Sequence, residues 1–436
     1  MSKLIIKNLG PITDFEMDIK DFNLIIGEQA VGKSTICKCI YFFRTLKDDV
    51  NAFIAELLLN NDKNNVLSKE ELITKLDVKA KDLFIKIFGD LEYTDLFIFY
   101  KYKESIDIKI EYDKDKKLII YYSDTLLDMI YNFYNEIRKI KYNKSEKRDI
   151  FSFDFFKRII PVIINKGIFD EEYKTYYIPA ARSSLSFFNN HKTTLDYEAI
   201  DFVNFKFIQL IENMQRIFND GIKGLNNKII NKKMRHNIIQ LSNKIINLMK
   251  GEYFSENGTE YILLDSEKKE KIPVNYISSG HQEILWLLNI LYYLIIRNEK
   301  AFVIIEEPEA HLYPKMQKEI VDFIVNFMNI TGSTVFITTH SPYILTSTNN
   351  LLYAGKIRKE KNNDDVNKKI DKLFGKYGII DTDKINAFKL YLKDYKTSYS
   401  NLINENSGEI MTELIDEISD YINETYTKLI DIEEYL

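Results

Sequence analysis

The chain has 436 residues, of which 45% are hydrophobic and 29% are charged, and its formal net charge is −5. These values are ordinary for a globular protein and provide enough apolar residues for a sizeable core. The net negative charge excludes a surface that is basic throughout, so any contact with nucleic acid has to come from a local patch.

The N-terminal segment predicts three short strands, at residues 3–7, 15–19 and 22–26. It lacks the apolar region of a signal peptide, and no apolar run in the chain is long enough to span a membrane, so a cytoplasmic protein is expected. The two cysteines, Cys37 and Cys39, fall in a predicted helix and point to different faces of it. They are expected to be buried, small apolar residues and not a metal or disulfide pair.

The third strand leads into a phosphate-binding P-loop with the spacing G-x-x-x-x-G-K-[ST]. In such a loop the backbone N–H groups and the start of the following helix converge on phosphate. Lys33 is then expected to reach the β- and γ-phosphates, and the Ser34 hydroxyl to hold Mg²⁺. The predicted nucleotide-binding residues are Gly27, Glu28, Gln29, Ala30, Val31, Gly32, Lys33, Ser34 and Thr35.

The next part of the chain predicts helices, over residues 35–46 and 50–90. Strand-like runs follow at 96–102, 106–112 and 117–122, the last two joined by a hairpin signal. They predict a small antiparallel sheet beside the nucleotide core. Residues 125–169 are again predicted to be helical.

After a short strand that begins at Tyr176 and ends at Pro179, apolar residues at helical spacing predict a helical hairpin arm inserted into the core over residues 193–250, with its second helix over 225–249. Its second helix is rich in basic residues and has no acidic ones. A phosphate backbone is one ligand for such a stripe, and a solvated lysine face is the alternative. The candidate nucleic-acid residues are Lys228, Lys232, Lys233 and Arg235.

A serine-rich helix start at residues 277–283 (ISSGHQE) offers hydroxyls and free N–H groups to an anion. The alternative is an ordinary N-cap at Ser278 or Ser279. The candidate residues are Ser278, Ser279, Gly280, His281 and Gln282.

Two further strand ends carry polar side chains. The apolar run 302–307 (FVIIEE) ends in Glu306 and Glu307, as in a Walker B segment, and a buried strand delivers such acids to the carboxyl edge of a parallel sheet. Glu306 is expected to hold Mg²⁺, and Glu307 to deprotonate the attacking water.

His340 follows the next strand, where a neutral imidazole would contact the γ-phosphate or the water. A structural histidine is the alternative.

The order P-loop, SSGHQ, EEPEAHLYP and TTHSPYIL resembles the ATP-binding-cassette type of ATPase, specifically the OLD-like bacterial AAA group related to SMC proteins. The resemblance covers residues 1–50 and about 175–355. It implies an α/β fold with an ABC-type head and a mixed sheet. It also implies that ATP and Mg²⁺ lie between two heads, because the signature at Ser279 and Gly280 of one subunit closes over the P-loop of the other.

Two departures from that family pattern matter. The residue at 306 is Glu where many relatives have Asp, and no Gln occurs between Gln29 and Gln209 to serve as a Q-loop glutamine, so Arg182 or a neighbour is a candidate replacement. The region after Tyr353 looks helical or loop-like and has no acidic cluster typical of the Toprim nuclease of OLD proteins.

The resulting hypothesis is a Mg²⁺-dependent ATPase that works as a dimeric or higher-order switch and controls a separate effector in bacterial antiphage defence, as in PARIS-type or Septu-type systems. The alternatives are a DNA-binding, SMC-like repair ATPase and a nucleotide-stabilised scaffold with little turnover. The predicted parts are an N-terminal ATPase lobe (1–50), an inserted helical and antiparallel β region (51–173), a return strand (174–192), the hairpin arm (193–250), a C-terminal ATPase lobe (251–355) and a helical extension (356–436) with an acidic helix over 405–436.

Overall fold

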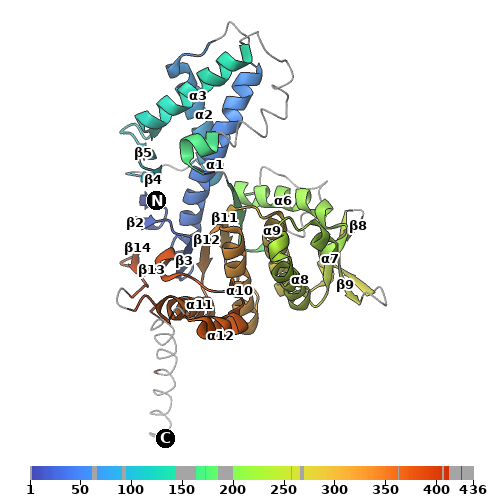
Figure 1. Ribbon diagram of the computed structural model, residues 1–436. Helices are drawn as coiled ribbons and strands as arrows, with labels where there is room; N and C mark the ends of the chain where they lie inside the picture. Colours follow the sequence, from blue (N-terminus) through green and yellow to red (C-terminus); the bar gives the residue numbers. More distant parts are fainter. Residues whose placement is uncertain are drawn as a thin grey trace.

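An 11-stranded mixed sheet organises the molecule (Figure 1). The computed structural model describes residues 2–60, 66–90, 95–142, 164–171, 173–184, 200–256, 258–265, 270–361, 363–404, 407–411 and 424. In spatial order the strands are β6 (Leu118–Tyr122), β5 (Ile106–Tyr112), β4 (Phe97–Lys103), β1 (Lys3–Leu9), β2 (Ile12–Asp18), β14 (Lys396–Asn401), β13 (Ile385–Lys393), β3 (Phe22–Gly27), β12 (Thr334–Thr339), β11 (Ala301–Glu306) and β7 (Lys174–Ile178). The predicted α/β class with a mixed sheet is confirmed.

The half of the sheet from β13 to β7 is parallel. Every residue of β11 and β12 is buried, as expected of central strands covered on both faces. Alternate residues of these strands enter two separate cores: Val303 and Ile305 face one, whereas Phe302 and Ile304 face the other. The continuous apolar runs in the sequence therefore reflect burial on both sides.

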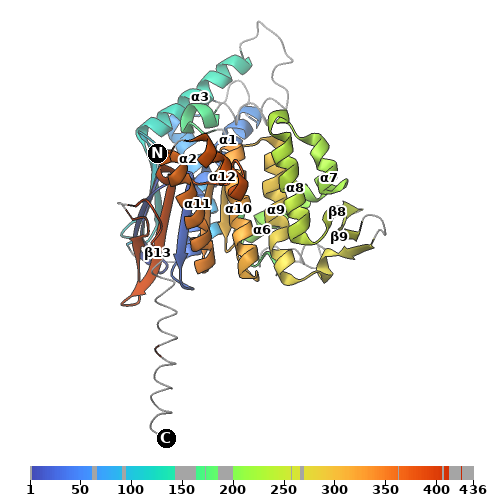
Figure 2. The same cartoon turned by 60° about the horizontal axis from the view of Figure 1, so that its bottom comes forward.

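Helices cover both faces of the sheet. The helix that follows β3, α1 (Lys33–Asn60), packs with α2 (Lys69–Phe88) and α3 (Asp124–Tyr142) in the core that contains Phe302 and Ile304. On the other face α8 (Arg235–Met249), α9 (Ser279–Arg297), α10 (Pro314–Thr331) and α11 (Pro342–Lys361) lie side by side (Figure 2). The helix α12 (Asp364–Phe374) packs on α11.

The strands of the antiparallel half belong to the same sheet as the P-loop strand. The predicted strands β4, β5 and β6 are present, but they do not form a separate small sheet, because β4 pairs with β1 along five residue pairs, from Lys3↔Lys101 to Lys7↔Phe97. The sequence pattern identified each strand but held no information about which other strand it would join.

Residues 202–249 do not form the predicted hairpin of two long helices. They fold into α6 (Phe202–Gln215), the short α7 (Gly221–Leu225) and α8, and their apolar residues share one core with α9. The predicted second helix over 225–249 is interrupted before Arg235, where short turns of 3₁₀-helix occur. Packing on α9 buries the apolar face that a free hairpin would have to bury within itself.

Strands β8 (Glu252–Glu256), β9 (Thr259–Asp265) and β10 (Glu270–Pro273) form a small antiparallel sheet, which the sequence analysis did not predict. Its signal in the sequence is the Asn257-Gly258 pair between alternating polar and apolar residues, a common hairpin turn.

The prediction of a helical or loop-like extension over residues 356–436 is wrong for β13 and β14, which lie within the main sheet between β2 and β3. The predicted acidic helix over 405–436 falls almost entirely outside the described residues.

Cys37 and Cys39 are buried and free, as predicted. Within the described part of the chain, no helix is both long and apolar enough to cross a membrane.

Candidate active site

The carboxyl ends of three parallel strands, β3, β12 and β11, bring the predicted catalytic segments together. Residue pairing places Thr339 beside Ile26, and Thr338 beside both Ile25 and Glu306. The P-loop after β3, the acids at the end of β11 and His340 after β12 therefore meet at one edge, the edge at which open α/β sheets bind ligands.

The two glycines of the P-loop are required by different contacts. A Cβ atom on Gly27 would lie 2.5 Å from the carbonyl oxygen of Leu390 on β13. Gly32 has a φ of +95°, and a Cβ there would lie 2.7 Å from Ile12 Cγ1. The loop is thus held against β13 and the β1–β2 turn, and a glycine is needed at each position because of this close approach.

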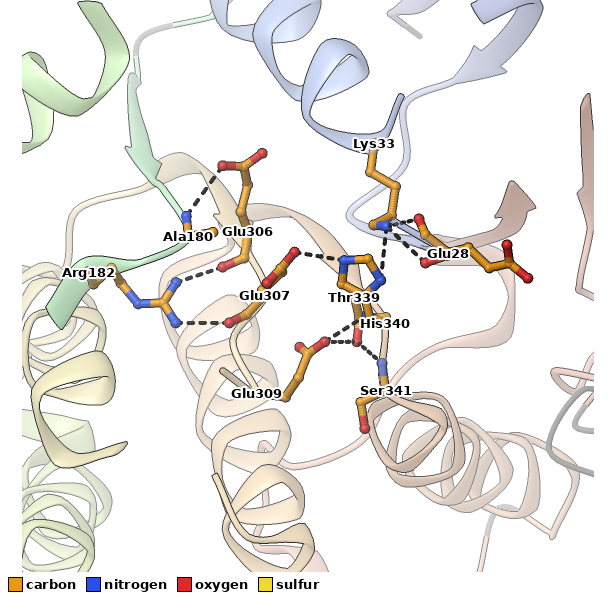
Figure 3. A network of polar contacts seen from close by, with 11 residues as sticks. Glu28, Lys33, Ala180, Arg182, Glu306, Glu307, Glu309, Thr339, His340 and Ser341 are labelled. Carbon is orange, nitrogen blue, oxygen red and sulfur yellow. Dashed lines mark hydrogen bonds and ion pairs between the residues drawn. The ribbon is translucent and has the colours of Figure 1, made fainter. Parts of the chain in front are cut away.

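The side chain of Lys33 turns back into its own loop. Its Nζ donates to the carbonyl oxygens of Gly27 at 2.8 Å and Glu28 at 2.6 Å, and lies 3.2 Å from His340 Nδ1 (Figure 3). Burial lowers the pKa of Lys33, and the carboxylates of Glu307 and Glu309 partly oppose that effect. All three donors of the ammonium group are used, so an arriving phosphate has to replace these partners. Charge-assisted bonds to phosphate are stronger than bonds to neutral carbonyls.

His340 links Lys33 to Glu307. The imidazole Nε2 lies 2.8 Å from Glu307 Oε1, on the opposite side of the ring from Lys33 (Figure 3). An ammonium group only donates, so Nδ1 accepts from Lys33 and Nε2 carries the proton donated to Glu307. One imidazole therefore joins the ammonium group of Lys33 to the carboxylate of Glu307, the proposed general base.

Glu306 has an unused oxygen at the same edge. Its Oε2 accepts from the backbone N of Ala180 at 3.3 Å, whereas its Oε1 is buried and has no hydrogen-bond partner among the described residues. An orphaned buried carboxylate oxygen is costly unless a cation or water occupies it. This donor fits Mg²⁺, which is commonly held by one or two protein oxygens together with water and substrate phosphates. The exposed Ser34 hydroxyl is the second candidate ligand.

Glu309 is a buried carboxylate that the sequence analysis quoted within EEPEAH but gave no role. Its Oε1 accepts from Thr339 Oγ1 at 2.6 Å and from the backbone N of His340 at 2.7 Å. These bonds fix the backbone that presents the imidazole. The signal that was missed is the third acid of the motif, placed on the turn directly after β11.

The predicted signature segment begins α9. Ser278 is the N-cap, since its side chain accepts from the backbone N of His281 and lies 2.6 Å from His281 Nδ1. Gln282 donates to the carbonyl oxygens of Val274 and Ile277. The N-cap interpretation therefore holds for Ser278. The anion-site prediction then rests on Ser279, whose side chain is exposed at the helix start, and on Gly280.

The side chain of Arg182 is directed to backbone groups of the protein. Its side chain is fully buried, and the guanidinium donates to carbonyl oxygens, including those of Glu306 and Glu307 (Figure 3). The suggestion that it replaces the Q-loop residue is therefore wrong for Arg182 itself.

The basic stripe is partly neutralised in the folded protein. Lys228 pairs with Asp220 at 3.7 Å, and Lys244, from the same stretch, pairs with Glu319 on α10 at 2.8 Å. Lys232 and Lys233 are exposed, whereas Arg235 is half-buried. The uninterrupted positive run of the sequence therefore becomes a smaller exposed patch.

The site has the arrangement of a P-loop nucleoside triphosphatase: a P-loop follows one parallel strand, two carboxylates end a second, and a histidine follows a third. Residues 1–345 match the model of the AAA ATPase domain family, and the chain belongs to that family.

Two curated proteins match over 93 residues, which is 21% of this chain. The uncharacterized protein MJ1542 of Methanocaldococcus jannaschii is 34% identical over that stretch, which is 11% of its length. The lipoprotein-releasing system ATP-binding protein LolD of Neorickettsia sennetsu is 29% identical, over 39% of its length. The matches thus span well under half of either relative.

Solved structures with a related arrangement include the SMC head domain from Thermotoga maritima, with a TM-score of 0.38 and 10% identity over 92% of this chain and 97% of that one. Another is an Smc head bound to the C-terminal winged-helix domain of ScpA, with a TM-score of 0.40 and 9% identity over 93% and 98% of the two chains. A third is the Smc head domain with an extended coiled coil bound to the C-terminal domain of ScpA from Pyrococcus furiosus. Its TM-score is 0.38, and it is 12% identical over 97% of this chain and 100% of that one.

Proposed function

We propose that this chain hydrolyses ATP to ADP and phosphate at a site completed by a second copy, and that the cycle controls a separate effector protein. The observation that carries the proposal is the connection from Lys33 through His340 to Glu307, beside the unused oxygen of Glu306. It combines a phosphate-binding cation, an oriented carboxylate base and a metal-ligand oxygen at one sheet edge.

Each residue of the site has a role that follows from its chemistry. Lys33 and the backbone N–H groups of the P-loop hold the phosphates, and Ser34 and Glu306 hold Mg²⁺, which supplies charge neutralisation at the transferred phosphoryl group. Glu307 accepts the proton of the attacking water, and the imidazole of His340 orients Glu307. When phosphate takes over Lys33, His340 Nδ1, which is an acceptor in this tautomer, is released to accept a hydrogen bond from the water.

The second copy is inferred from the exposed start of α9. Among the described residues the N–H groups of Ser279 and Gly280 have no hydrogen-bond partner, as in the first turn of any helix, and the ISSGHQE segment resembles an ABC-type signature. In this proposal they close over nucleotide that is held by the P-loop of the partner, and a cytoplasmic homodimer or higher oligomer is the working unit.

The assignment to antiphage defence rests on the resemblance of EEPEAHLYP and TTHSPYIL to OLD-like ATPases. Such a protein would act as the sensor or regulator, with the downstream chemistry supplied by the effector. A nucleotide-stabilised scaffold with little turnover is the competing function.

A measurement of ATP turnover against protein concentration tests this proposal. We expect the rate per chain to rise with concentration until dimers are saturated, because each site needs residues from two copies. A rate per chain that stays constant over a range in which light scattering shows monomers becoming dimers contradicts the composite site. Negligible turnover by an assembled, ATP-bound protein favours the scaffold.

DNA binding is a second candidate function, favoured by the exposed pair Lys232 and Lys233. Reversing the charge of Lys232, Lys233 and Arg235 to Glu is expected to weaken DNA binding and to flatten its dependence on salt, since each lost phosphate contact lowers the slope of log K against log salt by about 0.9. Lys244→Glu is the matched control, because Lys244 already faces the carboxylate of Glu319. Absence of DNA binding at low salt in the presence of ATP rules this function out.

A further inference from the structure

Arg182 is a fully buried arginine that joins three segments of the active-site edge. Its Nη1 donates to Pro179 O at 2.8 Å and to Glu306 O at 2.6 Å, and its Nη2 donates to Glu307 O at 2.9 Å. Its Nε donates to the backbone oxygen of Glu283 on α9 at 2.8 Å. A planar guanidinium with partners in several directions fixes their relative positions more rigidly than a single ammonium would.

The segment that Arg182 holds contains a strained residue. Glu307 has a φ of 44°, in the left-handed region that a residue with a side chain rarely adopts. Its backbone N donates to Thr338 O at 2.8 Å, and its carbonyl oxygen accepts from Arg182 Nη2. Such a conformation persists only where surrounding bonds enforce it. The direction in which Glu307 presents its carboxylate to His340 therefore depends on Arg182.

Glu283 connects the same arginine to the start of α9. Its Oε2 accepts from the backbone N of Arg182 at 3.0 Å, and its Oε1 accepts from Ser183 N at 3.1 Å and Ser183 Oγ at 2.6 Å. Arg182 and Glu283 are both 0% exposed. A satisfied ion pair in a fully buried, close-packed region is costly to break. A displacement of the start of α9 therefore moves Arg182 together with Glu283 and does not separate the two.

We propose that Arg182 is a positioning residue that couples the N-terminus of α9 to the orientation of Glu307. The inference rests on the proposed function, in which Glu307 is the base and the start of α9 meets the nucleotide of the partner. Docking of the partner at Ser279 then alters the conformation of Glu307 in the same chain, so that hydrolysis at one composite site responds to occupation of the other.

A second physical route between the same segments exists and has to be separated from this one. A Cβ atom on Gly280 would lie 2.7 Å from His311 O, so the first turn of α9 also touches the chain just beyond Glu309. A double-mutant cycle distinguishes the two routes, because only the route through Arg182 is removed by substituting that residue.

The experiment combines Ser278→Ala, which removes the N-cap of α9, with Arg182→Lys in the full chain without nucleotide. The readout is hydrogen exchange of the backbone N–H groups of Glu307 and Ala310. We expect Ser278→Ala alone to raise their exchange about threefold or more, and to add less than about twofold in the Arg182→Lys background. ATP turnover of the same four proteins is expected to show the same non-additivity.

Arg44→Lys is the matched control, because Arg44 is another buried arginine paired with a glutamate, Glu171, at 2.7 Å, and it contacts neither α9 nor Glu307 in the described structure. We expect it to lower the melting temperature while leaving the effect of Ser278→Ala on Glu307 intact. If Arg182→Lys does not fold, Glu283→Gln weakens the same connection and takes its place, with His311→Ala measured beside it because Glu283 Oε1 also lies 3.7 Å from His311 Nδ1.

The proposal is overturned if Ser278→Ala changes exchange at Glu307 equally in both backgrounds, which assigns the coupling to the contact of Gly280 with His311, or if the change never reaches Glu307. Absence of ATP turnover in the wild-type chain, together with the expected exchange pattern, contradicts the proposed function and leaves the coupling standing.

Discussion

Glutamine at position 307 is expected to reduce ATP turnover by about 100-fold or more, since general-base catalysis contributes about 10²–10⁴ to a rate. ATP binding should remain, because the amide keeps the size of the side chain and Glu307 makes no bond to the P-loop. One carboxylate oxygen lies 2.8 Å from His340 Nε2, and the amide oxygen of Gln can accept the same proton. Glu307→Gln therefore separates binding from hydrolysis.

The measurement is steady-state phosphate release, together with equilibrium binding of a fluorescent ATP analogue. Glu256→Gln is the control, because Glu256 is an exposed glutamate on β8 that pairs with Lys271 and should not affect either quantity. Trapping of a nucleotide-bound dimer by Glu307→Gln would add support. Rapid turnover by this variant would exclude Glu307 as the base.

The second large effect is expected from Lys33→Ala, which removes the cation that the P-loop presents to phosphate. Loss of two charge-assisted hydrogen bonds, at about 1.5 kcal/mol or more each, weakens ATP binding by about 100-fold or more. Lys38→Ala is the matched control on α1, because Lys38 pairs with Asp201 at 2.6 Å. Unchanged ATP affinity in a folded Lys33→Ala protein contradicts the assigned site.

Much of the parallel half of the fold was predictable from local patterns. The runs that form β3, β11 and β12 are continuous and apolar because both faces of these strands are buried, and each ends in a motif whose chemistry requires a sheet edge. Their position relative to one another follows from the parallel register. Lys33, Glu307 and His340 were therefore each predicted, and the structure brings them together.

The parts that were missed depend on partners far away in the sequence. β13 pairs with β3 although more than 350 residues separate Ile385 from Phe22, and nothing local to residues 385–393 identifies that neighbour. Long-range pairing of this kind is decided by tertiary contacts that override local preference. The two-helix hairpin was predicted wrongly for the same reason, because the apolar face of α8 packs against α9.

Arg182 shows a different limit of sequence reasoning. Arginine is among the residues least often fully buried, and Arg182, just after a short strand, was a candidate to replace the Q-loop glutamine. Its actual partners are carbonyl oxygens and a buried glutamate on another element. A buried cation is recognisable only when all of the groups that satisfy it are known.

The central claim, that one ATP site needs residues from two copies, is tested most directly by mixing two inactive variants. Lys33→Ala lacks a working P-loop, and Ser279→Arg blocks the start of α9, so each should be inactive alone. Random exchange of subunits gives half heterodimers, each with one intact composite site, and the mixture should recover activity up to about a quarter of the wild-type rate, the value for two independent sites. Full activity of Ser279→Arg alone, or no recovery once heterodimers have been demonstrated, contradicts the account.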